Sequence, residues 1–349
     1  EFYTADACLE PNASRLAVLG NRPRATYPHI ALHLRAEYQR RHGFSQRQRC
    51  DPRPAEFPRL ASDHLRSPQP RLAQRPCVLP EWHELPTKGG NVFEHWGGDL
   101  EGIRQGLDYL EALGVNGIYL NPIFVSPSNH RYDTEDYMQV DPHLGGDAAL
   151  RTLLDEAHAR GFKVVLDGVF NHTGDRLEEF QRARDNHPER ALYTWLPGGG
   201  YEAFFGVPTL PKLDFASPMT YTHFLEGEHA PLRHWLRFGA DGWRLDVPNE
   251  IDDDGFWQEF RRRVKSANKD AYIVGEIWGD ATRWLQGDQF DAVMNYPFTR
   301  LALGFCGAKT LQQSVIKDTG YSDMLPVNAE DLAARAEELL KHHPWEITL

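Results

Sequence analysis

Apolar runs alternate with amphipathic stretches along the chain from Trp82 onward. Short apolar runs bounded by Gly and Pro are typical of buried strands, whereas apolar residues three and four positions apart are typical of helices. Five strands are predicted, at residues 115–124, 163–170, 242–246, 271–276 and 292–296. The main helices are predicted at residues 100–113, 146–160, 218–238, 256–268 and 330–341, with shorter helices near Thr282 and Leu301.

This alternation of strands with helices determines the predicted fold class. Parallel neighbouring strands need a long crossover, which is usually a helix. We therefore predict an α/β fold with a parallel sheet, either open or closed into a (β/α)8 TIM barrel. In both folds the carboxyl ends of the strands share one edge, which is where functional side chains gather.

Composition and charge narrow the classes of partner. The chain has 349 residues and a net charge of −12, which allows a large core and argues against a nucleic-acid partner. No run of about eighteen apolar residues occurs, so no membrane span is expected. The start of the chain lacks a signal-peptide pattern, and the four cysteines are widely spaced, which favours free thiols in a reducing compartment. A cytoplasmic location is therefore expected, and a homodimer is left open.

The stretch from Gly242 to Glu250 carries the first candidate for chemistry. Arg244 and Asp246 are two positions apart, so on a strand both side chains point to the same side. The positive charge of Arg244 favours the anion of Asp246, which predicts an ionised carboxylate at neutral pH. Such a carboxylate at a strand end suits a nucleophile or a metal ligand, and a structural ion pair is the alternative.

A second carboxyl group follows about thirty residues later. Glu276 ends the strand predicted at 271–276, and the helix before it makes a unit with parallel strands, so Glu276 and Asp246 are expected at the same edge. Glu276 lies between apolar neighbours, which predicts a raised pKa and a protonated carboxyl group. One ionised and one neutral carboxyl group form the pair used in glycoside hydrolysis.

Four segments then carry a family resemblance. DGVFNH (167–172), PKLD (211–214), GWRLD (242–246) and VGE (274–276) resemble, in order, conserved regions of the α-amylase family of glycoside hydrolases, glycoside hydrolase family 13. The resemblance covers residues 90–349 and implies a TIM barrel with a small domain inserted after its third strand. The segment SNHRYD (128–133), together with Asn249 and Glu250, is most similar to the neopullulanase, cyclomaltodextrinase and maltogenic amylase branch.

The resemblance implies a retaining mechanism that agrees with the reading of the two carboxyl groups. Asp246 would be the nucleophile that forms a glycosyl-enzyme ester. Glu276 would protonate the leaving oxygen and then activate water or a sugar acceptor. Arg244 would orient and ionise Asp246. The implied substrates are maltooligosaccharides, cyclodextrins or pullulan, with α-1,4 or α-1,6 bonds and hydrolysis or transglycosylation left open.

The resemblance also implies substrate-binding residues. His172 would bond to the sugar at the cleavage point, Tyr132 would stack under that sugar, and Asp133 would support the same pocket. A packing role in the core is the alternative for His172 and for Tyr132. Acceptor binding and plain packing have equal weight for three further aromatic residues, Phe204, Phe205 and Trp278.

Two parts of the family pattern are absent from the sequence. No His-Asp pair follows Glu276, although the family carries its third catalytic carboxylate in such a pair after strand seven. No first strand is recognisable upstream of Trp82. We therefore expect strands two to six of an incomplete barrel. The alternative function is a catalytically impaired fragment, or a sugar-binding protein that keeps its subsites without turnover.

No cofactor or metal is expected for the reaction. A metal hydrolase using Asp167, His172 and Asp246 is disfavoured, because no H-E-x-x-H motif or comparable cluster supports it. A structural Ca²⁺ near Asn121 is raised by analogy with the family, but the sequence offers no acidic cage for it.

The chain divides into three predicted parts. Residues 1–80 are rich in Arg and Pro, contain no Lys and have one predicted helix at 30–41. We expect this segment to be disordered or loosely packed, with anion or partner binding as the weaker alternative. Residues 81–349 are expected to form the partial catalytic domain. Residues 173–216, which are rich in Gly, Pro and aromatic residues, are expected to be the inserted small domain.

Overall fold

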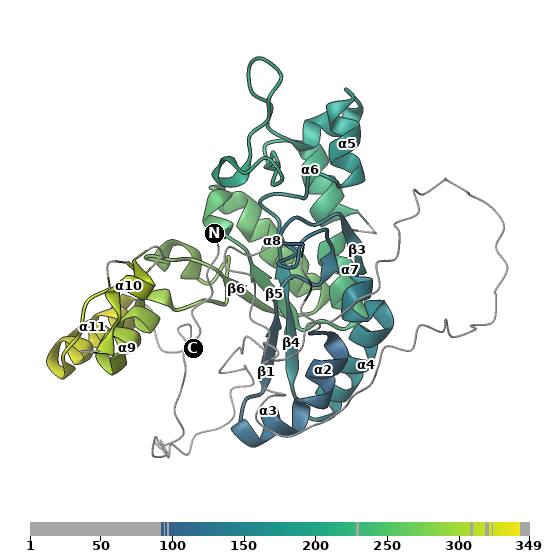
Figure 1. Cartoon of the computed structure of the whole chain (residues 1–349). Coiled ribbons are helices and arrows are strands. Elements are labelled where there is room, and N and C mark those ends of the chain that lie inside the picture. The colour runs from purple at the N-terminus through teal and green to yellow at the C-terminus, as the bar shows by residue number, and fades with distance from the viewer. Residues whose placement is uncertain are drawn as a thin grey trace.

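The computed structural model describes residues 92, 93, 95, 98–227, 230–307, 310–317, 321, 322 and 324–342. The segment predicted at residues 1–80, including its helix at 30–41, lies outside the described residues. Within the described part of the chain, the main feature is one parallel sheet with helices packed along it (Figure 1).

The five strands of this sheet follow one another in space as they do along the chain. They are β1 (Gly117–Leu120), β4 (Lys163–Gly168), β5 (Gly242–Leu245), β6 (Tyr272–Gly275) and β7 (Ala292–Val293). Every neighbouring pair is parallel, and the register sets Asp167 beside Arg244 and Leu245 beside Gly275. The prediction of five parallel strands is confirmed. Their order in the sheet is that of consecutive strands in a (β/α)8 barrel.

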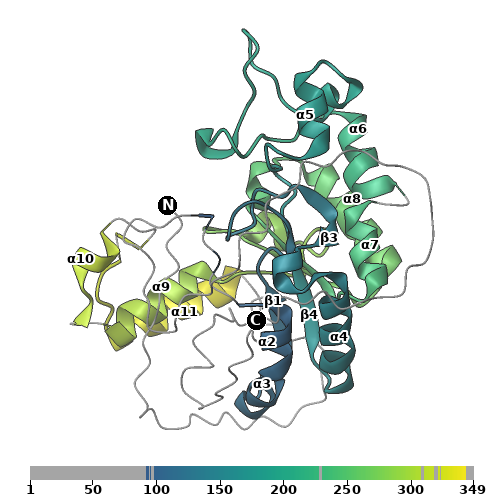
Figure 2. The ribbon, with the colours of Figure 1, turned by 45° about the vertical axis from the view of Figure 1, so that its right-hand side comes forward.

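Amphipathic helices lie before and between the strands along the chain and cover one side of the sheet (Figures 1 and 2). They are α2 (Leu100–Gln105), α3 (Leu107–Leu113), α4 (Gly146–Ala159), α7 (Pro231–Phe238) and α8 (Asp254–Ala267). Helix α2 packs on α4, and α7 packs on α8. Gly114, at φ 84°, ends α3 as predicted, because glycine tolerates the left-handed conformation of a helix end.

Alternation along β5 separates the core from the polar face. The fully buried Trp243 packs edge-on against Phe170, which in turn contacts Phe260 of α8. Successive strand residues point to opposite faces, so Arg244 faces away from this aromatic layer. One face of the sheet is therefore apolar and covered by helices, and the other carries charged groups.

The predictions for the strand at 115–124 and for the loop after it are partly wrong. The strand ends at Leu120, and Phe124 belongs to a separate hairpin of β2 (Phe124–Val125) and β3 (Asp136–Val140). Pro122 lies between the two strands, and a proline has no N–H group with which to continue the ladder. The loop at 126–135 is therefore the tip of a hairpin.

The segment at 173–216 contains more regular structure than its sequence indicates. It holds helix α5 (Glu178–Arg184), where no helix is predicted, and isolated antiparallel bridges that pair Tyr193 with Leu213 and Trp195 with Tyr201. The helix predicted at 218–238 is divided into α6 (Pro218–Tyr221), the π-helical turn η4 (Thr222–Glu226) and α7. Short 3-10 turns complete the connections: η1 (Pro142–Leu144), η2 (Pro188–Leu192), η3 (Phe204–Gly206), η5 (Pro248–Glu250) and η6 (Thr282–Leu285).

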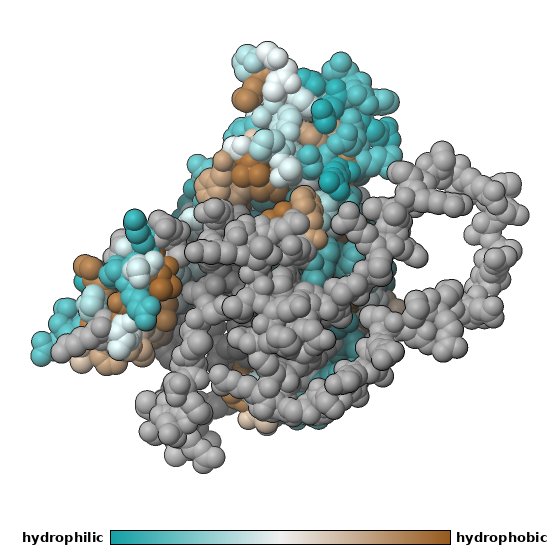
Figure 3. Space-filling view, viewed as in Figure 1, coloured by the Kyte–Doolittle hydropathy of each residue, from teal (hydrophilic) through white to brown (hydrophobic). Residues whose placement is uncertain are grey.

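Three helices lie beyond the β6 and β7 end of the sheet, at the left of Figure 1. They are α9 (Tyr296–Gly307), α10 (Gln313–Ile316) and α11 (Ala329–His342), and α11 packs on α9. Apolar residues gather over this part of the surface (Figure 3), where Phe298, Val315 and Leu325 are exposed. Among the residues that the structure describes, every helix is too short or too polar to span a lipid bilayer.

Candidate active site

The two predicted catalytic carboxyl groups lie at the same edge of the sheet. Asp246 directly follows β5 and Glu276 directly follows β6. The backbone of both residues continues the ladder, because Asp246 N donates to Gly168 O at 3.1 Å and Glu276 N donates to Leu245 O at 3.0 Å. The prediction that parallel strands bring these two acids to one rim is therefore confirmed.

One guanidinium group connects the two acids. Arg244 Nη1 lies 2.9 Å from Asp246 Oδ1, and Arg244 Nη2 lies 2.7 Å from Glu276 Oε2. Arg244 is buried, while Asp246 and Glu276 remain 8% and 9% exposed. The two carboxyl groups are thus held by opposite nitrogens of one rigid fork, at the edge of the protein interior.

A third carboxylate, missed as a site residue from the sequence, completes this cluster. Asp167 near the end of β4 accepts two hydrogen bonds from Arg244 Nη1, at 3.0 and 3.1 Å. It also accepts hydrogen bonds from the hydroxyl groups of Tyr119 and Tyr132. The signal for Asp167 was its place at the start of the DGVFNH segment, while Tyr119 looked like an ordinary apolar strand residue. We call Asp167, Asp246, Glu276 and Arg244 the carboxylate cluster.

The charges of the carboxylate cluster do not balance if every acid is ionised. Burial, together with the neighbouring carboxylates Asp167 and Glu276, raises the pKa of Asp246 to about 8 against the attraction of Arg244. Burial also raises the pKa of Asp167. The prediction that Arg244 simply keeps Asp246 ionised is wrong, because one guanidinium is shared among three acids. The cluster therefore takes up protons as a unit.

The surroundings of Glu276 also differ from the prediction. The sequence predicts apolar neighbours, but the carboxyl group accepts hydrogen bonds from Tyr296 Oη at 2.9 Å and from Val247 N at 3.2 Å, besides its contact with Arg244. Val247 has φ 36° and ψ 51°, a left-handed conformation that is strained for a β-branched residue. This conformation turns the Val247 amide toward Glu276, so backbone strain is stored next to the two acids.

The loop at the tip of the β2–β3 hairpin carries Tyr132 to the cluster. The half-buried Tyr132 donates to Asp167 Oδ2 at 3.1 Å. Asp133 is buried one residue further on, where it accepts hydrogen bonds from the hydroxyl groups of Ser126 and Ser128. Within the part of the chain that the structure describes, Asp133 therefore bonds to its own loop and not to the carboxylate cluster, and it holds the loop that presents Tyr132.

His172 lies at the base of the 173–216 segment. Its ring is buried and stacks on Phe204, with centroids 4.9 Å apart and an interplanar angle of 8°. Burial lowers the pKa of His172 to about 3, so the ring is neutral. Asn171 Nδ2 lies 3.1 Å from Nδ1, and Nε2 is buried near the backbone of Tyr132 without a hydrogen bond of good geometry to any described residue. Nε2 is therefore a candidate donor to a ligand.

Solvent exposure distinguishes the three aromatic residues for which acceptor binding and packing were both predicted. Phe204 is buried under His172 and against Val247 and Leu210, which assigns it a packing role. Phe205 is 68% exposed and Trp278 is 55% exposed. These two side chains therefore remain accessible to a ligand.

A carboxyl pair on adjacent strand ends of a parallel α/β sheet, backed by a third acid, defines the class of glycoside hydrolases that use two acids. Residues 54–202 and 199–343 match the model of the alpha amylase catalytic domain. The chain belongs to the α-amylase family.

Relatives and solved structures agree with this membership. The chain is 46% identical over 234 residues to a cyclomaltodextrinase of Geobacillus thermopakistaniensis, a match that covers 64% of this chain and 39% of the relative. It is 43% identical over 236 residues to an intracellular maltogenic amylase of Bacillus subtilis, covering 65% and 39% of the two chains. A neopullulanase of Thermoactinomyces vulgaris is a further relative. The chain thus spans about two fifths of the length of these curated relatives.

A crystal structure of a debranching enzyme from Nostoc punctiforme, soaked with acarbose, has the same fold. The TM-score is 0.66 at 43% sequence identity, and the alignment covers 71% of this chain and 55% of that chain. The predicted fold class and family are therefore confirmed.

Proposed function

We propose that the protein is a retaining α-glucan hydrolase or transglycosylase. The observation that carries the proposal is the contact of one guanidinium, Arg244, with both Asp246 and Glu276 at the rim of the sheet. A guanidinium that contacts both carboxyl groups holds them near each other. A short separation of the two acids favours a nucleophile over a general base.

In the proposed first step, a carboxylate oxygen of Asp246 attacks the anomeric carbon, and the bond from that carbon to the leaving oxygen breaks. Glu276 gives its proton to the leaving oxygen, so the leaving sugar departs with a neutral hydroxyl group. Asp246 holds the shared proton in the resting cluster, so the productive form is the one in which that proton has passed to Glu276 and Asp246 is the anion. Arg244 balances one of the negative charges in that form.

In the proposed second step, Glu276 acts as the base. It takes a proton from water or from a sugar hydroxyl group, whose oxygen then displaces the ester oxygen of Asp246 from the anomeric carbon. Two displacements restore the original configuration of the sugar, and the cluster recovers its starting protonation. Hydrolysis and transglycosylation differ only in the acceptor.

Substrate contacts are proposed for the side chains around the cluster. The Tyr132 ring, tied to Asp167 through its hydroxyl group, offers a face for the sugar at the cleavage point. The neutral His172 offers an Nε2–H donor to a sugar hydroxyl group. Asp133 acts indirectly by holding the loop of Tyr132 through Ser126 and Ser128.

Relatives indicate the substrate class and the location. The names cyclomaltodextrinase, maltogenic amylase and neopullulanase favour α-1,4 bonds of maltooligosaccharides, cyclodextrins and pullulan as substrates, with α-1,6 bonds as a further target. The word intracellular in the name of the Bacillus relative favours the cytoplasm. We propose residues 81–349 as the catalytic domain and residues 173–216 as its inserted domain, with the carboxylate cluster between them.

The test is turnover of maltotriose and of a cyclodextrin by the full chain, with Asp246→Asn as the matched control. We expect turnover by the wild type and a loss of about 10³ or more in the variant, because the nucleophile is removed. The far-ultraviolet circular dichroism spectra of the two proteins should be the same. Proton NMR should show the α-anomer first. A β-anomer formed first, or equal rates in the two proteins, would contradict the proposal.

A second function has its own supporting observation. The pKa of Asp246 is raised to about 8, so the proposed nucleophile holds a proton at neutral pH. A sugar-binding protein without turnover would fit an Asp246 that keeps this proton. Binding of acarbose together with no turnover of either substrate would favour this function over the first.

A further inference from the structure

Val247, directly after Asp246, has a backbone conformation that its residue type does not favour. Its φ of 36° and ψ of 51° lie in the left-handed region, which a β-branched residue rarely adopts. Pro248 follows, and the residue before a proline also prefers the extended region. Because both preferences oppose the observed conformation, contacts with the rest of the protein must hold it.

The N–H group of Val247 is the group that this conformation places at the site. It donates to Glu276 Oε2 at 3.2 Å, and Arg244 Nη2 lies 2.7 Å from the same oxygen. Glu276 Oε1 accepts a hydrogen bond from the Tyr296 hydroxyl group at 2.9 Å. An oxygen that accepts from two donors has no lone pair left to carry a proton, so the proton that Glu276 transfers belongs on Oε1. The Val247 amide thus helps to orient the acid.

The Val247 side chain is held from the 173–216 segment. It lies in a small apolar cluster with Phe204 and Leu210, in which Phe204 is 3% exposed and the other two side chains are 6% exposed. Relaxation of the backbone would take the side chain out of this contact, so the cluster opposes that relaxation. The carbonyl group of Val247 is held separately, because it accepts from Glu250 N at 3.0 Å in η5.

The loop that carries Phe204 and Leu210 is itself closed by backbone contacts. Phe204 N donates to Leu210 O at 2.9 Å, and an antiparallel bridge pairs Ala203 with Pro211. The Phe204 ring also stacks on His172, which follows β4. The two side chains that touch Val247 are therefore fixed relative to the strand ends.

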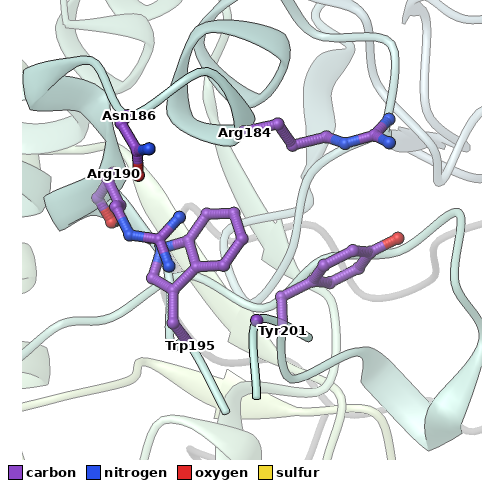
Figure 4. Close-up of a pocket in the computed structure, with 6 residues that line it drawn as sticks. Arg184, Asn186, Arg190, Trp195 and Tyr201 are labelled. Carbon is purple, nitrogen blue, oxygen red and sulfur yellow. Dashed lines mark hydrogen bonds between the residues drawn. The ribbon is translucent and has the colours of Figure 1, made fainter. Parts of the chain in front are cut away.

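The rest of the 173–216 segment supports this loop. Trp195 and Tyr201 pair across a further antiparallel bridge, and the fully buried Phe180 of α5 contacts both rings. The Arg190 guanidinium covers the Trp195 ring, 3.7 Å from its centroid (Figure 4). The segment thus has packing of its own, which a support for a strained residue requires.

We propose that Phe204 and Leu210 are positioning residues of the reaction, which hold Val247 in its left-handed conformation and so keep its N–H group on Glu276; this inference rests on the proposed function. Both side chains are buried, so they act through Val247 and not by contact with the sugar. Removal of the Leu210 side chain leaves a cavity beside Val247 and allows its backbone to relax toward the extended region. The N–H group then leaves Glu276, and the step that needs the proton slows.

Crystal structures of the full chain, as wild type and as Leu210→Ala, test this arrangement without reliance on turnover. We expect Val247 to leave the left-handed region in the variant and its N–H group to lie beyond hydrogen-bond distance of Glu276 Oε2. Leu192→Ala is the matched control, because Leu192 is a buried leucine of the same segment that packs in the main core, and it should keep the Val247 conformation. A left-handed Val247 in the Leu210 variant would overturn the proposal, since the hydrogen bond to Glu250 would then suffice.

Kinetics separate positioning from a general loss of stability. The value of kcat/KM is measured for maltotriose, whose leaving sugar needs the Glu276 proton, and for nitrophenyl maltoside, whose leaving group departs without it. We expect Leu210→Ala to lower the maltotriose value about tenfold more than the nitrophenyl value, the usual contribution of a hydrogen bond to a charged group. Leu210→Val, which removes a single carbon atom, should show a smaller change of the same kind. Leu192→Ala should lower both values by the same factor.

The same substitution in a Val247→Gly background completes the test. Glycine adopts the left-handed region without a side chain to hold it there, so Leu210→Ala should leave the ratio of the two kcat/KM values unchanged in that background. A ratio that Leu210→Ala leaves unchanged in the wild-type background, or changes equally in both backgrounds, would overturn the proposal. Failure of the wild type to turn over either substrate, with the Val247 change seen in the crystal structures, would contradict only the proposed function.

Discussion

At the scale of single residues, Arg244 determines the electrostatics of the site. Its two terminal nitrogens contact three acids, Asp167, Asp246 and Glu276. Burial alone lowers the pKa of Arg244, but the charges around it, that of Asp167 most strongly, raise it well above the ordinary value, so the guanidinium stays charged. The proposed mechanism needs one proton among the three acids. Three carboxylates would carry more negative charge than one guanidinium balances, so the cluster retains that proton.

Folding stability should depend on pH through this proton. A carboxyl group whose pKa is raised in the folded protein binds its proton more tightly there than in the unfolded chain, so the stabilisation is complete at low pH. It is lost as pH rises from the ordinary pKa of 3.8 to the raised value of about 8. Asn has no such proton to lose. We therefore expect the Tm of Asp246→Asn to exceed that of the wild type by a margin that grows between these two pH values.

Thermal unfolding at a series of pH values measures this margin. Glu276→Gln in the same series shows whether the effect belongs to Asp246. A margin that stays constant with pH, or one that shrinks as pH rises, would mean that Asp246 does not hold the proton in the folded protein.

Replacement of Glu276 tests the acid role separately from the nucleophile. Glu276→Gln removes the proton donor while keeping the shape of the side chain. We expect maltotriose turnover to fall by about 10²–10⁴, the usual contribution of general acid catalysis, while a substrate with a good leaving group is far less affected. Rates of maltotriose and nitrophenyl maltoside hydrolysis provide the comparison. Equal losses on both substrates would argue against the acid role.

At the scale of elements, the close approach of β5 and β6 sets the distance between the two acids. A side-chain carbon on Gly242 would overlap the Tyr272 backbone of β6. Gly242→Ala should therefore separate the two strands, with a loss of about 1–3 kcal/mol or more in the free energy of unfolding and a loss of activity. Urea unfolding and maltotriose turnover measure both effects.

Gly279→Ala is the matched control for this substitution. No heavy atom lies within 4 Å of the position that its new carbon would take. It should leave stability and activity close to those of the wild type. Wild-type stability in the Gly242 variant would show that the strands tolerate a wider spacing than the structure indicates.

The elements also show how far the sequence alone can predict this molecule. Periodicity located the five parallel strands and the rim that joins Asp246 to Glu276, because burial fixes the alternation along each strand. It missed helix α5, since the fully buried Phe180 packs against aromatic residues brought close by antiparallel bridges that no local pattern reveals. It also placed Phe124 in the first strand, because a continuous apolar run does not show where the chain changes partner.

The site residues also fall into two groups, those that the sequence could predict and those that it could not. Asp246, Glu276 and Tyr132 could be predicted, because they occupy strand ends or a polar loop. The contacts of Tyr119 and Tyr296 with the acids could not, since they join residues 48 and 20 positions apart. The sharing of Arg244 among three acids likewise depends on register across three strands and not on spacing within one.

At the scale of the whole molecule, the two edges of the sheet carry different sets of charged groups. The carboxylate cluster occupies the carboxyl edge. At the amino edge, Asp241 accepts hydrogen bonds from Lys163 Nζ and Val164 N, each at 2.9 Å, and pairs with His158 Nε2 at 2.6 Å. In α/β sheets of this kind, the carboxyl edge serves function and the amino edge serves stability.

Substitution at each edge should therefore give opposite results. Asp241→Asn should lower the free energy of unfolding by about 1–3 kcal/mol, because charged hydrogen bonds are lost, while kcat and KM for maltotriose stay unchanged. Asp167→Asn should abolish turnover, since it alters the charge of the cluster. Urea unfolding and steady-state kinetics on both variants provide the comparison. A lower kcat in Asp241→Asn would show that the amino edge contributes to the site.

The most direct measurement is to trap the covalent intermediate. Glu276→Gln protein is incubated with a fluorinated glucosyl fluoride, which reacts without acid assistance and gives a slowly hydrolysed ester, and peptic peptides are sequenced by mass spectrometry. We expect one sugar attached to Asp246. A sugar attached to Asp167 or to another residue, or consumption of the fluoride with no labelled peptide, would contradict the assignment of Asp246 as the nucleophile.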